Sequence, residues 1–280
     1  MLVGICVRVK NEDIILLEFV AHYINLGFDK IHIYDNNSDK SVNILLEKLI
    51  KKYPGIITIE NDFSNPNEPK WGQTNRYNEF LNANRKLDWI LNCDADEFLY
   101  LNTHDNIKSF LSEFSDDTSV IPINWITFGT SKLEHFNPDK LVIEQFIYRE
   151  DYNNFWNLFQ KSLIRPNLIT KIVNWHFHDS ENYLTKNVYN EIIVKSSEAN
   201  IKLIEKEMDR LNDTTPLVMI HYMTLDYNNM QKKHNKNKGF LISMDDNKYT
   251  REWYSNYFKD NNVDKRMYKY INNIKNILDN

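Results

Sequence analysis

Two aspartates that directly follow an apolar segment form the most chemically informative pattern in this sequence. Residues 88–93 are predicted to form a buried strand, and Asp94, Ala95 and Asp96 come next. Side chains two positions apart on an extended chain point to the same side, so both carboxylates can face one point. Two carboxylates at such a short distance raise each other's pKa unless a cation lies between them. The pattern favours Mg²⁺ or Mn²⁺, which commonly takes further ligands from substrate phosphates. A solvated turn is the plain alternative.

The composition indicates a folded protein of one large α/β domain or two small ones. The chain has 280 residues, of which 42% are hydrophobic and 13% aromatic. A formal net charge of −5 argues against nucleic acid as a partner. Cys6 and Cys93 lie in apolar segments and are expected to be buried free thiols, which favours a reducing, cytoplasmic location. Residues 1–7 are expected to form a strand and not a signal peptide, and no apolar run has the length of a membrane span.

Strand and helix patterns alternate over residues 1–100. The predicted strands are 2–9, 31–34, 56–59 and 88–93, and the predicted helices are 12–26, 42–52 and 73–86. Alternation with short connections predicts a parallel sheet with right-handed crossovers. In such sheets, ligands bind beyond the carboxyl ends of the strands.

Polar residues stand at three of these carboxyl ends. They are Lys10, Asn11 and Glu12; Asp35 and Asn36; and Asp94 and Asp96. Because the ends of parallel strands meet at one edge of the sheet, the sequence predicts a shared nucleotide site there. Capping of the first helix by Asn11 and an Asx turn at Asp35 are the structural alternatives.

The pattern changes after residue 100. A short helix capped by Asp105 is followed by strand-like segments at 118–126, 141–149 and 161–165, which predicts a mixed sheet added to the first half. We expect one domain over residues 1–240, with lobes 1–100 and 101–240, and a helical extension over 241–280. The apolar face of the last predicted helix, 263–279, is expected to pack against the body, with peripheral membrane contact as the alternative.

These pieces together resemble the GT-A glycosyltransferases, in particular family 92 and its family-2-like relatives. The resemblance spans about residues 2–240 and rests on an ordered set of segments: 10–12, 33–38, 89–98, 125–129, 161–166, 175–178, 221–222 and the lysines and glycine of 232–239. It implies an α/β fold with a Rossmann-like nucleotide-binding half and a mixed-sheet acceptor half. It also implies transfer of a sugar from a nucleotide donor, UDP-linked by preference, to a glycan or other hydroxyl acceptor, with Mn²⁺ or Mg²⁺ and with inversion.

The resemblance also suggests roles for individual residues. Metal ligands would be Asp94, Asp96 and His221, with Asp94 nearer the ribose and sugar. The donor would contact residues of the strand ends, the third helix and a later lysine-rich segment: Lys10, Asn11, Glu12, Asp35, Asn36, Gln73, Arg76, Asp94 and Lys238. Arg76 would pair with a phosphate or with Asp94, or lie on a solvated helix face. Lys232 and Lys233 would approach the diphosphate, or simply belong to a lysine-rich surface.

Inversion requires a general base for the acceptor hydroxyl. Asp179 and Glu181 follow the two aspartates at the distance at which related enzymes place an acid, and His176 and His178 are further candidates. Trp125 and Trp175 are expected either to stack on sugars or to pack in the core.

One departure from the family pattern concerns the donor phosphates. Thr224-Leu225-Asp226-Tyr227 stands where a Lys-Ser pair is usual. A metal-dependent nucleotidyltransferase is an alternative enzyme class, but the turn at residues 8–12 lacks the glycines of a phosphate loop. A non-catalytic carbohydrate-binding protein is the other alternative, and it would not need paired aspartates beside Lys10 and Asp35.

Overall fold

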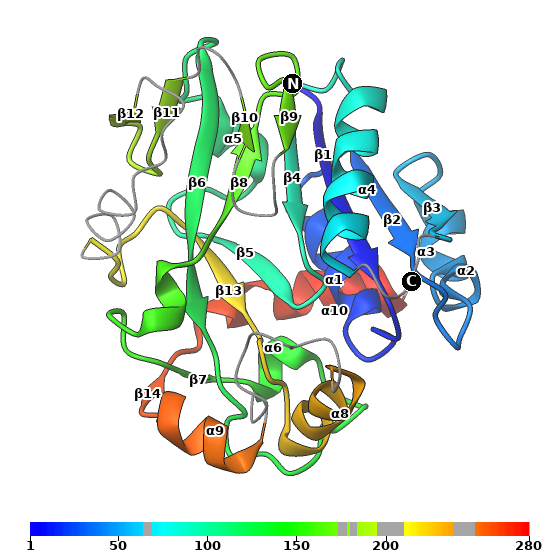
Figure 1. Cartoon of the computed structure of the whole chain (residues 1–280), viewed down its shortest axis with the longest axis vertical. Helices are drawn as coiled ribbons and strands as arrows, with labels where there is room; N and C mark the ends of the chain where they lie inside the picture. The colour runs from blue at the N-terminus through cyan, green and yellow to red at the C-terminus, as the bar shows by residue number, and fades with distance from the viewer. Residues whose placement is uncertain (64–68, 173–177, 180–183, 195–209, 238–249, 280) are drawn as a thin grey trace.

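A ten-stranded mixed sheet runs through the protein and carries all the polar strand ends named above. The computed structural model describes residues 1–63, 69–172, 178–179, 184–194, 210–237 and 250–279 (Figure 1). The sheet has the strand order β12-β11-β6-β8-β4-β1-β2-β3, with β5 and β13 joined beside β6.

The first half is the predicted parallel sheet. Its strands are β1 (Val3–Val9), β2 (Lys30–Asp35), β3 (Ile57–Asn61) and β4 (Trp89–Cys93), and they pair in parallel in the order β4-β1-β2-β3. The connecting helices are α1 (Leu16–Asn25), α2 (Val42–Leu45), α3 (Glu47–Lys52) and α4 (Pro69–Ala83). Gly27 follows α1 with a φ of 85°, the left-handed conformation that commonly ends a helix.

Apolar side chains cover both faces of this sheet. Phe19, Val20 and Tyr23 of α1 are fully buried on one face, together with Ile5 and other odd-numbered residues of β1. A second cluster on the other face joins Cys6 and Ile90 to side chains of α4, namely Tyr77, Phe80 and Leu81. The sheet lies between α4 and the layer of α1 and α10 (Figure 1). This two-sided burial holds the strand ends rigidly.

The second half adds antiparallel and parallel pairs to the same sheet. β8 (Gln160–Ile164) runs antiparallel to both β4 and β6 (Thr118–Thr127). β13 (Leu217–His221) pairs antiparallel with β5 (Glu97–Leu101) and parallel with β6. β11 (Leu184–Lys186) and β12 (Ile192–Val194) extend the sheet beyond β6, whereas β9 (Lys171–Ile172) and β10 (His178–Asp179) form a separate two-stranded sheet. A Rossmann-like half joined to a mixed-sheet half confirms the predicted α/β fold class.

Local predictions failed where distant side chains decide the conformation. The predicted strand 141–149 is a short helix, α6 (Val142–Gln145), followed by β7 (Tyr148–Arg149). Glu18 of α1 accepts hydrogen bonds from the amides of Val142 at 2.5 Å and Ile143 at 3.1 Å, which stabilises the start of this helix. The helix α5 (Ile107–Leu111) is capped by Asn106 and not by Asp105.

The first helix also begins later than predicted. Asn11 has a φ of 57° and lies in a turn before α1, so it is not the N-cap. Its side chain instead accepts a hydrogen bond from the amide of Asp39 at 2.7 Å and donates one to Asp39 Oδ2 at 2.9 Å. The turns after β1 and β2 are therefore tied to each other.

The C-terminal segments pack on the body. They are α8 (Tyr227–Asn237), α9 (Arg251–Tyr257), β14 (Asn262–Val263), the 3₁₀ helix η2 (Arg266–Tyr270) and α10 (Ile271–Asp279), while η1 (Phe155–Leu158) precedes β8. Ile274 of α10 is fully buried against the α1 layer, and Lys52 donates to two carbonyls at the end of α10. The apolar face of α10 thus packs as predicted. No helix among the described residues is long and apolar enough to cross a membrane.

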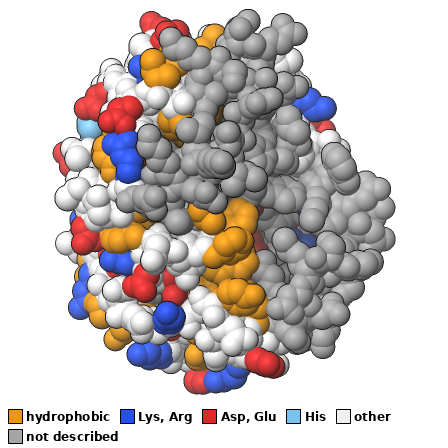
Figure 2. All heavy atoms as spheres, turned by 60° about the vertical axis from the view of Figure 1, so that its left-hand side comes forward, with side chains coloured by type: hydrophobic (Ala, Val, Ile, Leu, Met, Phe, Trp, Pro, Cys, Tyr) orange, Lys and Arg blue, Asp and Glu red, His pale blue; other side chains and the backbone are white. Residues whose placement is uncertain are grey.

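Charges of both signs are interspersed on the described surface in Figure 2.

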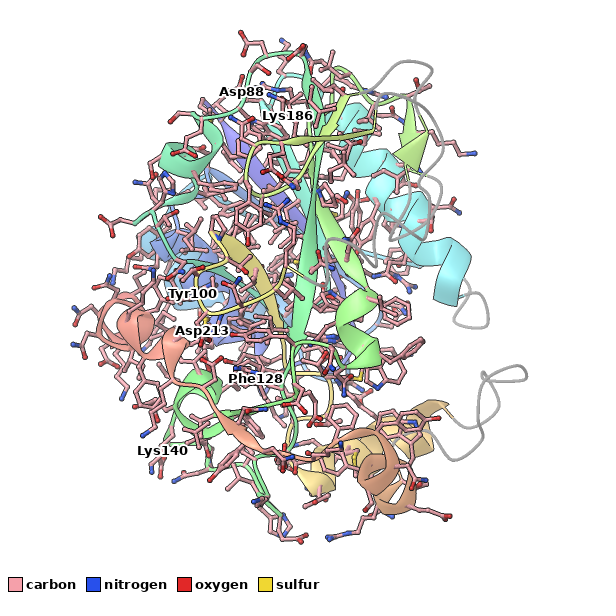
Figure 3. The ribbon with its side chains drawn as sticks, turned by 90° about the vertical axis from the view of Figure 1, so that its left-hand side faces the viewer. Asp88, Tyr100, Phe128, Lys140, Lys186 and Asp213 are labelled. Atoms are coloured by element: carbon pink, nitrogen blue, oxygen red, sulfur yellow. The ribbon has the colours of Figure 1, made fainter. Side chains whose placement is uncertain are left out.

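The cation of Arg266, whose side chain is largely buried, joins the C-terminal segment to the body. Arg266 lies over the ring of Tyr100 and pairs with Asp213 at 3.0 Å, and both of these residues are labelled in Figure 3.

Candidate active site

Asp94 is held from three directions at the end of β4. Its Oδ1 accepts a hydrogen bond from Gln73 Nε2 of α4 at 2.6 Å, and its Oδ2 accepts one from Lys161 Nζ of β8 at 2.9 Å. Its backbone amide donates to Glu97 Oε2 at 2.8 Å. The side chain is still 40% exposed, so this fixed carboxylate faces outward. Gln73 and Asp94, two of the residues expected to contact the donor, thus lie side by side.

A buried lysine and a buried glutamate support that carboxylate. Lys161 is 1% exposed and lies 3.5 Å from Glu97, which is fully buried. Burial raises the pKa of Glu97 well above its ordinary value, and the nearby lysine opposes this only in part. For Asp94, burial also raises the pKa, but Lys161 outweighs it and the net pKa is lowered. Lys161 and Asp94 therefore form the charged pair of the group.

Asp96 pairs with a different lysine. Lys233 Nζ of α8 lies 2.6 Å from Asp96 Oδ2 and also donates to the carbonyl of Met223. Nε2 of His221 lies 3.6 Å from Asp96 Oδ1. Burial raises the pKa of Asp96, but Lys233 and His221 outweigh it and hold the pKa far below its ordinary value. The side chain of Asp96 is thus strongly favoured in its ionised form.

The unusual segment after His221 positions α8. Asp226 is fully buried and accepts hydrogen bonds from the amide of Asn229 at 2.8 Å and from the amide of Phe136 at 2.7 Å. It therefore caps the first turn of α8 and fixes this helix to the body. The residue that departs from the family pattern thus orients the helix that carries Lys233.

The described residues supply at most part of a site for a divalent cation, so metal binding through Asp96 and substrate phosphates stays a prediction. Among the described residues, no group of three His, Cys, Asp or Glu side chains is placed to hold a metal. Both oxygens of Asp94 are engaged by Gln73 and Lys161. One or two carboxylates with substrate phosphates are nevertheless the usual shell of Mg²⁺.

His221 fits a metal less well than Asp96 does. A ligating histidine normally donates its second ring N–H to an acceptor. Nδ1 of His221 is buried, and no described residue accepts from it. The imidazole packs on Trp125 with 4.2 Å between ring centroids, and Trp125 is only 7% exposed. The ring therefore faces Asp96 from a fixed aromatic support, and its role as a ligand stays a prediction.

The turns after β1 and β2 form the neighbouring part of the site. Asp35 is 8% exposed, and its Oδ1 accepts from the amide of Ser38 at 2.9 Å, which is the Asx turn that the sequence offered as the structural alternative. The amide of Asn36 donates to the carbonyl of Val9, so Asn36 lies beside the end of β1. Its Oδ1 is buried without a partner among the described residues.

Arg76 does not reach Asp94. Its Nε lies 3.1 Å from Asp62 and its Nη1 2.5 Å from Glu79. Asp62 follows β3, is fully buried and also pairs with Arg8 of β1 at 2.5 Å. The sequence reading missed Asp62, although it stands at a strand carboxyl end like the residues that were chosen.

Other predicted residues fall partly or wholly outside the described part. Asp179 belongs to β10 and pairs with Lys171 in the register, but its side chain is not described. Glu181, Lys238, Trp175 and His176 lie outside the described residues. Lys10 and Glu12 lie in the turn after β1, where the carbonyl of Glu12 accepts from the amides of Ile15 and Leu16.

The sequence reading gave Lys161 no role. Its signal was weak: Lys161 stands between polar Gln160 and Ser162, in a strand whose apolar residues, Leu163 and Ile164, come only at its end. A lysine is rarely buried unless it is paired.

Comparison with known proteins identifies the family. A sequence model described as glycosyltransferase family 92 matches residues 3–218. A family 92 protein of Ricinus communis is 21% identical over 183 residues, which cover 64% of this chain and 32% of the relative. A family 92 protein of Arabidopsis thaliana is 26% identical over 184 residues, covering 59% of this chain and 29% of the relative. The chain spans about a third of the length of these curated relatives.

Solved structures show a more distant likeness. A crystal structure of S. aureus TarS in complex with UDP has a TM-score of 0.40 and 14% identity, over 88% of this chain and 68% of that one. The family model, by contrast, covers residues 3–218, which include both aspartates and the buried lysine that pairs with Asp94. This chain belongs to glycosyltransferase family 92.

Proposed function

We propose that this protein transfers a sugar from a UDP-linked donor to a hydroxyl group of a glycan acceptor. Family membership supports the reaction class. The observation that carries the proposal is the placement of Asp94 and Asp96 at the end of β4, each paired with its own lysine. The turns of Asp35 and Asn36 lie at the same edge, because the amide of Asn36 bonds to the end of β1 and β1 pairs with β4. This edge is where open α/β sheets bind nucleotides.

Each group has a separate task in the proposed reaction. The strand-end turns bind the base and ribose, and Asp94 accepts a hydrogen bond from a donor hydroxyl. Asp96 and His221 would hold Mn²⁺ or Mg²⁺, which supplies a Lewis acid for the leaving diphosphate. Lys233 lies where its charge can also approach that diphosphate. In an inverting reaction, Asp179 or Glu181 would accept the proton of the acceptor hydroxyl.

The test is a screen of nucleotide sugars with Mn²⁺, in which release of UDP or GDP is measured. We expect release from one UDP-sugar, its loss in EDTA, and its loss in Asp96→Ala. Calorimetry should show that EDTA strongly weakens UDP binding by the wild type. In Asp96→Ala, EDTA should cause no further decrease in UDP affinity. Equal UDP affinity with and without EDTA would remove the metal from the proposal. Failure to bind any nucleoside diphosphate would remove the function itself.

A further inference from the structure

We propose that Lys161 is a positioning residue that serves as a built-in cation for Asp94. In this arrangement Asp94 is held for a ribose hydroxyl of the donor without needing a metal ion to stay in place. The inference rests on the proposed function and assigns a role in it to a residue outside the strand-end turns.

The geometry distinguishes the two aspartates. Lys161 is 1% exposed, comes from a strand between β4 and β6, and contacts Asp94 at 2.9 Å and Glu97 at 3.5 Å. Lys233, which pairs with Asp96, is 22% exposed and comes from the surface helix α8. A phosphate or a metal ion can displace a partly exposed lysine at the surface. It cannot readily displace one enclosed by the sheet.

The strand residues next to Lys161 on the same face of the sheet are apolar. The next inward-facing residue of β8, Leu163, is apolar and fully buried, and so is Ile123, which is opposite Lys161 in the register. An apolar residue would suit such surroundings, because a lysine buried in the sheet loses its hydration. Asp94, with 40% of its side chain exposed, could be satisfied by water. The arrangement is therefore better explained by a need to fix the direction of the Asp94 carboxylate.

Gln73 completes this fixation. Its amide binds the second oxygen of Asp94, while Gln73 itself contacts the hydroxyl of Tyr77, which donates to the carbonyl of Cys93. The Asp94 amide is bonded to Glu97. Two side chains thus hold the Asp94 carboxylate and a third holds its backbone amide. A positioned acceptor of this kind can bind a hydroxyl without first losing conformational freedom.

The experiment removes the cation and leaves only Asp94, whose side chain is 40% exposed and can be hydrated, without its charged partner. Lys161→Met alone leaves the acids Glu97 and Asp94 without a cation. If this single variant failed to fold, the result would say nothing about nucleotide binding. The double variant Lys161→Met/Glu97→Gln removes the positive charge and replaces the Glu97 carboxyl, whose pKa burial raises, with an amide that cannot ionise; this amide still offers an oxygen to the Asp94 backbone amide. Lys161→Gln/Glu97→Gln serves in its place if the first pair does not fold. Melting temperature and UDP affinity are measured by calorimetry, in Mn²⁺ and again in EDTA.

We expect the double variant to melt near the wild type and to bind UDP about tenfold more weakly, a difference of about 1.4 kcal/mol. UDP affinity should fall by the same factor in Mn²⁺ and in EDTA, because Lys161 acts on Asp94 and not through the metal. Ile274→Ala, in the buried face of α10, is the matched control: it should lower the melting temperature and leave UDP affinity unchanged.

Two results would overturn the inference alone. One is normal UDP affinity in the folded double variant. The other is a decrease in UDP affinity that is seen in Mn²⁺ but disappears in EDTA. No UDP binding by the wild type in either buffer would overturn the proposed function, and the inference with it.

Discussion

Lys233 Nζ lies 2.6 Å from Oδ2 of Asp96, so a helix late in the chain supplies the cation for a carboxylate at the end of β4. The ammonium group stands next to the oxygen that a metal ion would use. If Asp96 binds a metal ion, as proposed, the metal would have to compete with Lys233 for this oxygen.

This competition predicts stronger metal binding when the lysine is removed. We expect Lys233→Met to bind Mn²⁺ about tenfold more tightly than the wild type in the absence of nucleotide, which corresponds to about 1.4 kcal/mol. Calorimetric titration with Mn²⁺ measures this. Lys232→Met, on the exposed side of the same helix, is the control and should titrate like the wild type. Weaker Mn²⁺ binding in Lys233→Met would show that the lysine supports the site instead of competing for it.

The turn after β2 is expected to read the nucleotide. Asp35→Ala would remove both the carboxylate and the hydrogen bond from the Ser38 amide, so it confounds binding with folding. Asp35→Asn keeps an oxygen for that amide and removes the charge. We expect Asp35→Asn to weaken UDP binding while its melting temperature stays near that of the wild type. Unchanged affinity with a lower melting temperature would reduce Asp35 to a turn-forming residue.

The catalytic base is tested by kinetics. Asp179→Asn should lower turnover by about 10²–10⁴-fold, the usual contribution of a positioned base. Donor affinity should stay near the wild-type value, because the proposed donor ligands stand on other strands. If Asp179→Asn retains full transfer and Glu181→Gln loses it, the role belongs to Glu181. If both remain active, His176 and His178 are the next candidates.

Glu18 makes stability depend on pH. Burial raises its pKa to about 7, although the amides of Ile143 and Val142 oppose this. A carboxyl with a pKa raised above its unfolded value of 4.5 contributes stability that is fully present below pH 4.5 and is lost as pH rises through about 7. We expect the wild type to lose about 3 kcal/mol relative to Glu18→Gln across this window. Denaturant titrations at pH 4.5 and 8 measure the difference, and parallel pH profiles of the two proteins would contradict it.

Gly129, at the end of β6, has no room for a side chain. A methyl group there would collide with the carboxylate of Asp260 and the hydroxyl of Tyr254. These two groups are hydrogen bonded at 2.7 Å, and Tyr254 also accepts from the amide of Thr130, which ties α9 to the sheet. We expect Gly129→Ala to destabilise the protein by about 1–3 kcal/mol. Thermal unfolding measures the loss, and Ala21→Gly in α1 gives a reference for an ordinary change of one methyl group.

Residues close in sequence determined the first half of the fold and the position of the two aspartates. Alternating apolar segments and helix patterns sufficed to predict β1 to β4, because the order strand-helix-strand restricts the topology to a parallel sheet. The same rule placed Asp35, Asn36, Asp94 and Asp96 at one edge. It applies equally to Asp62, which could have been predicted.

Tertiary structure alone decided which cations these carboxylates meet. Lys161 is 67 residues from Asp94, and Lys233 is 137 residues from Asp96. The periodicity of a sequence cannot predict a contact between residues so far apart. Such a contact depends on the order in which strands pair and on where a later helix packs. The same holds for α6: Glu18, 124 residues away from Val142, turns an apolar segment that reads as a strand into a capped helix. Local pattern supplied the acids, and long-range packing of the second half supplied their partners.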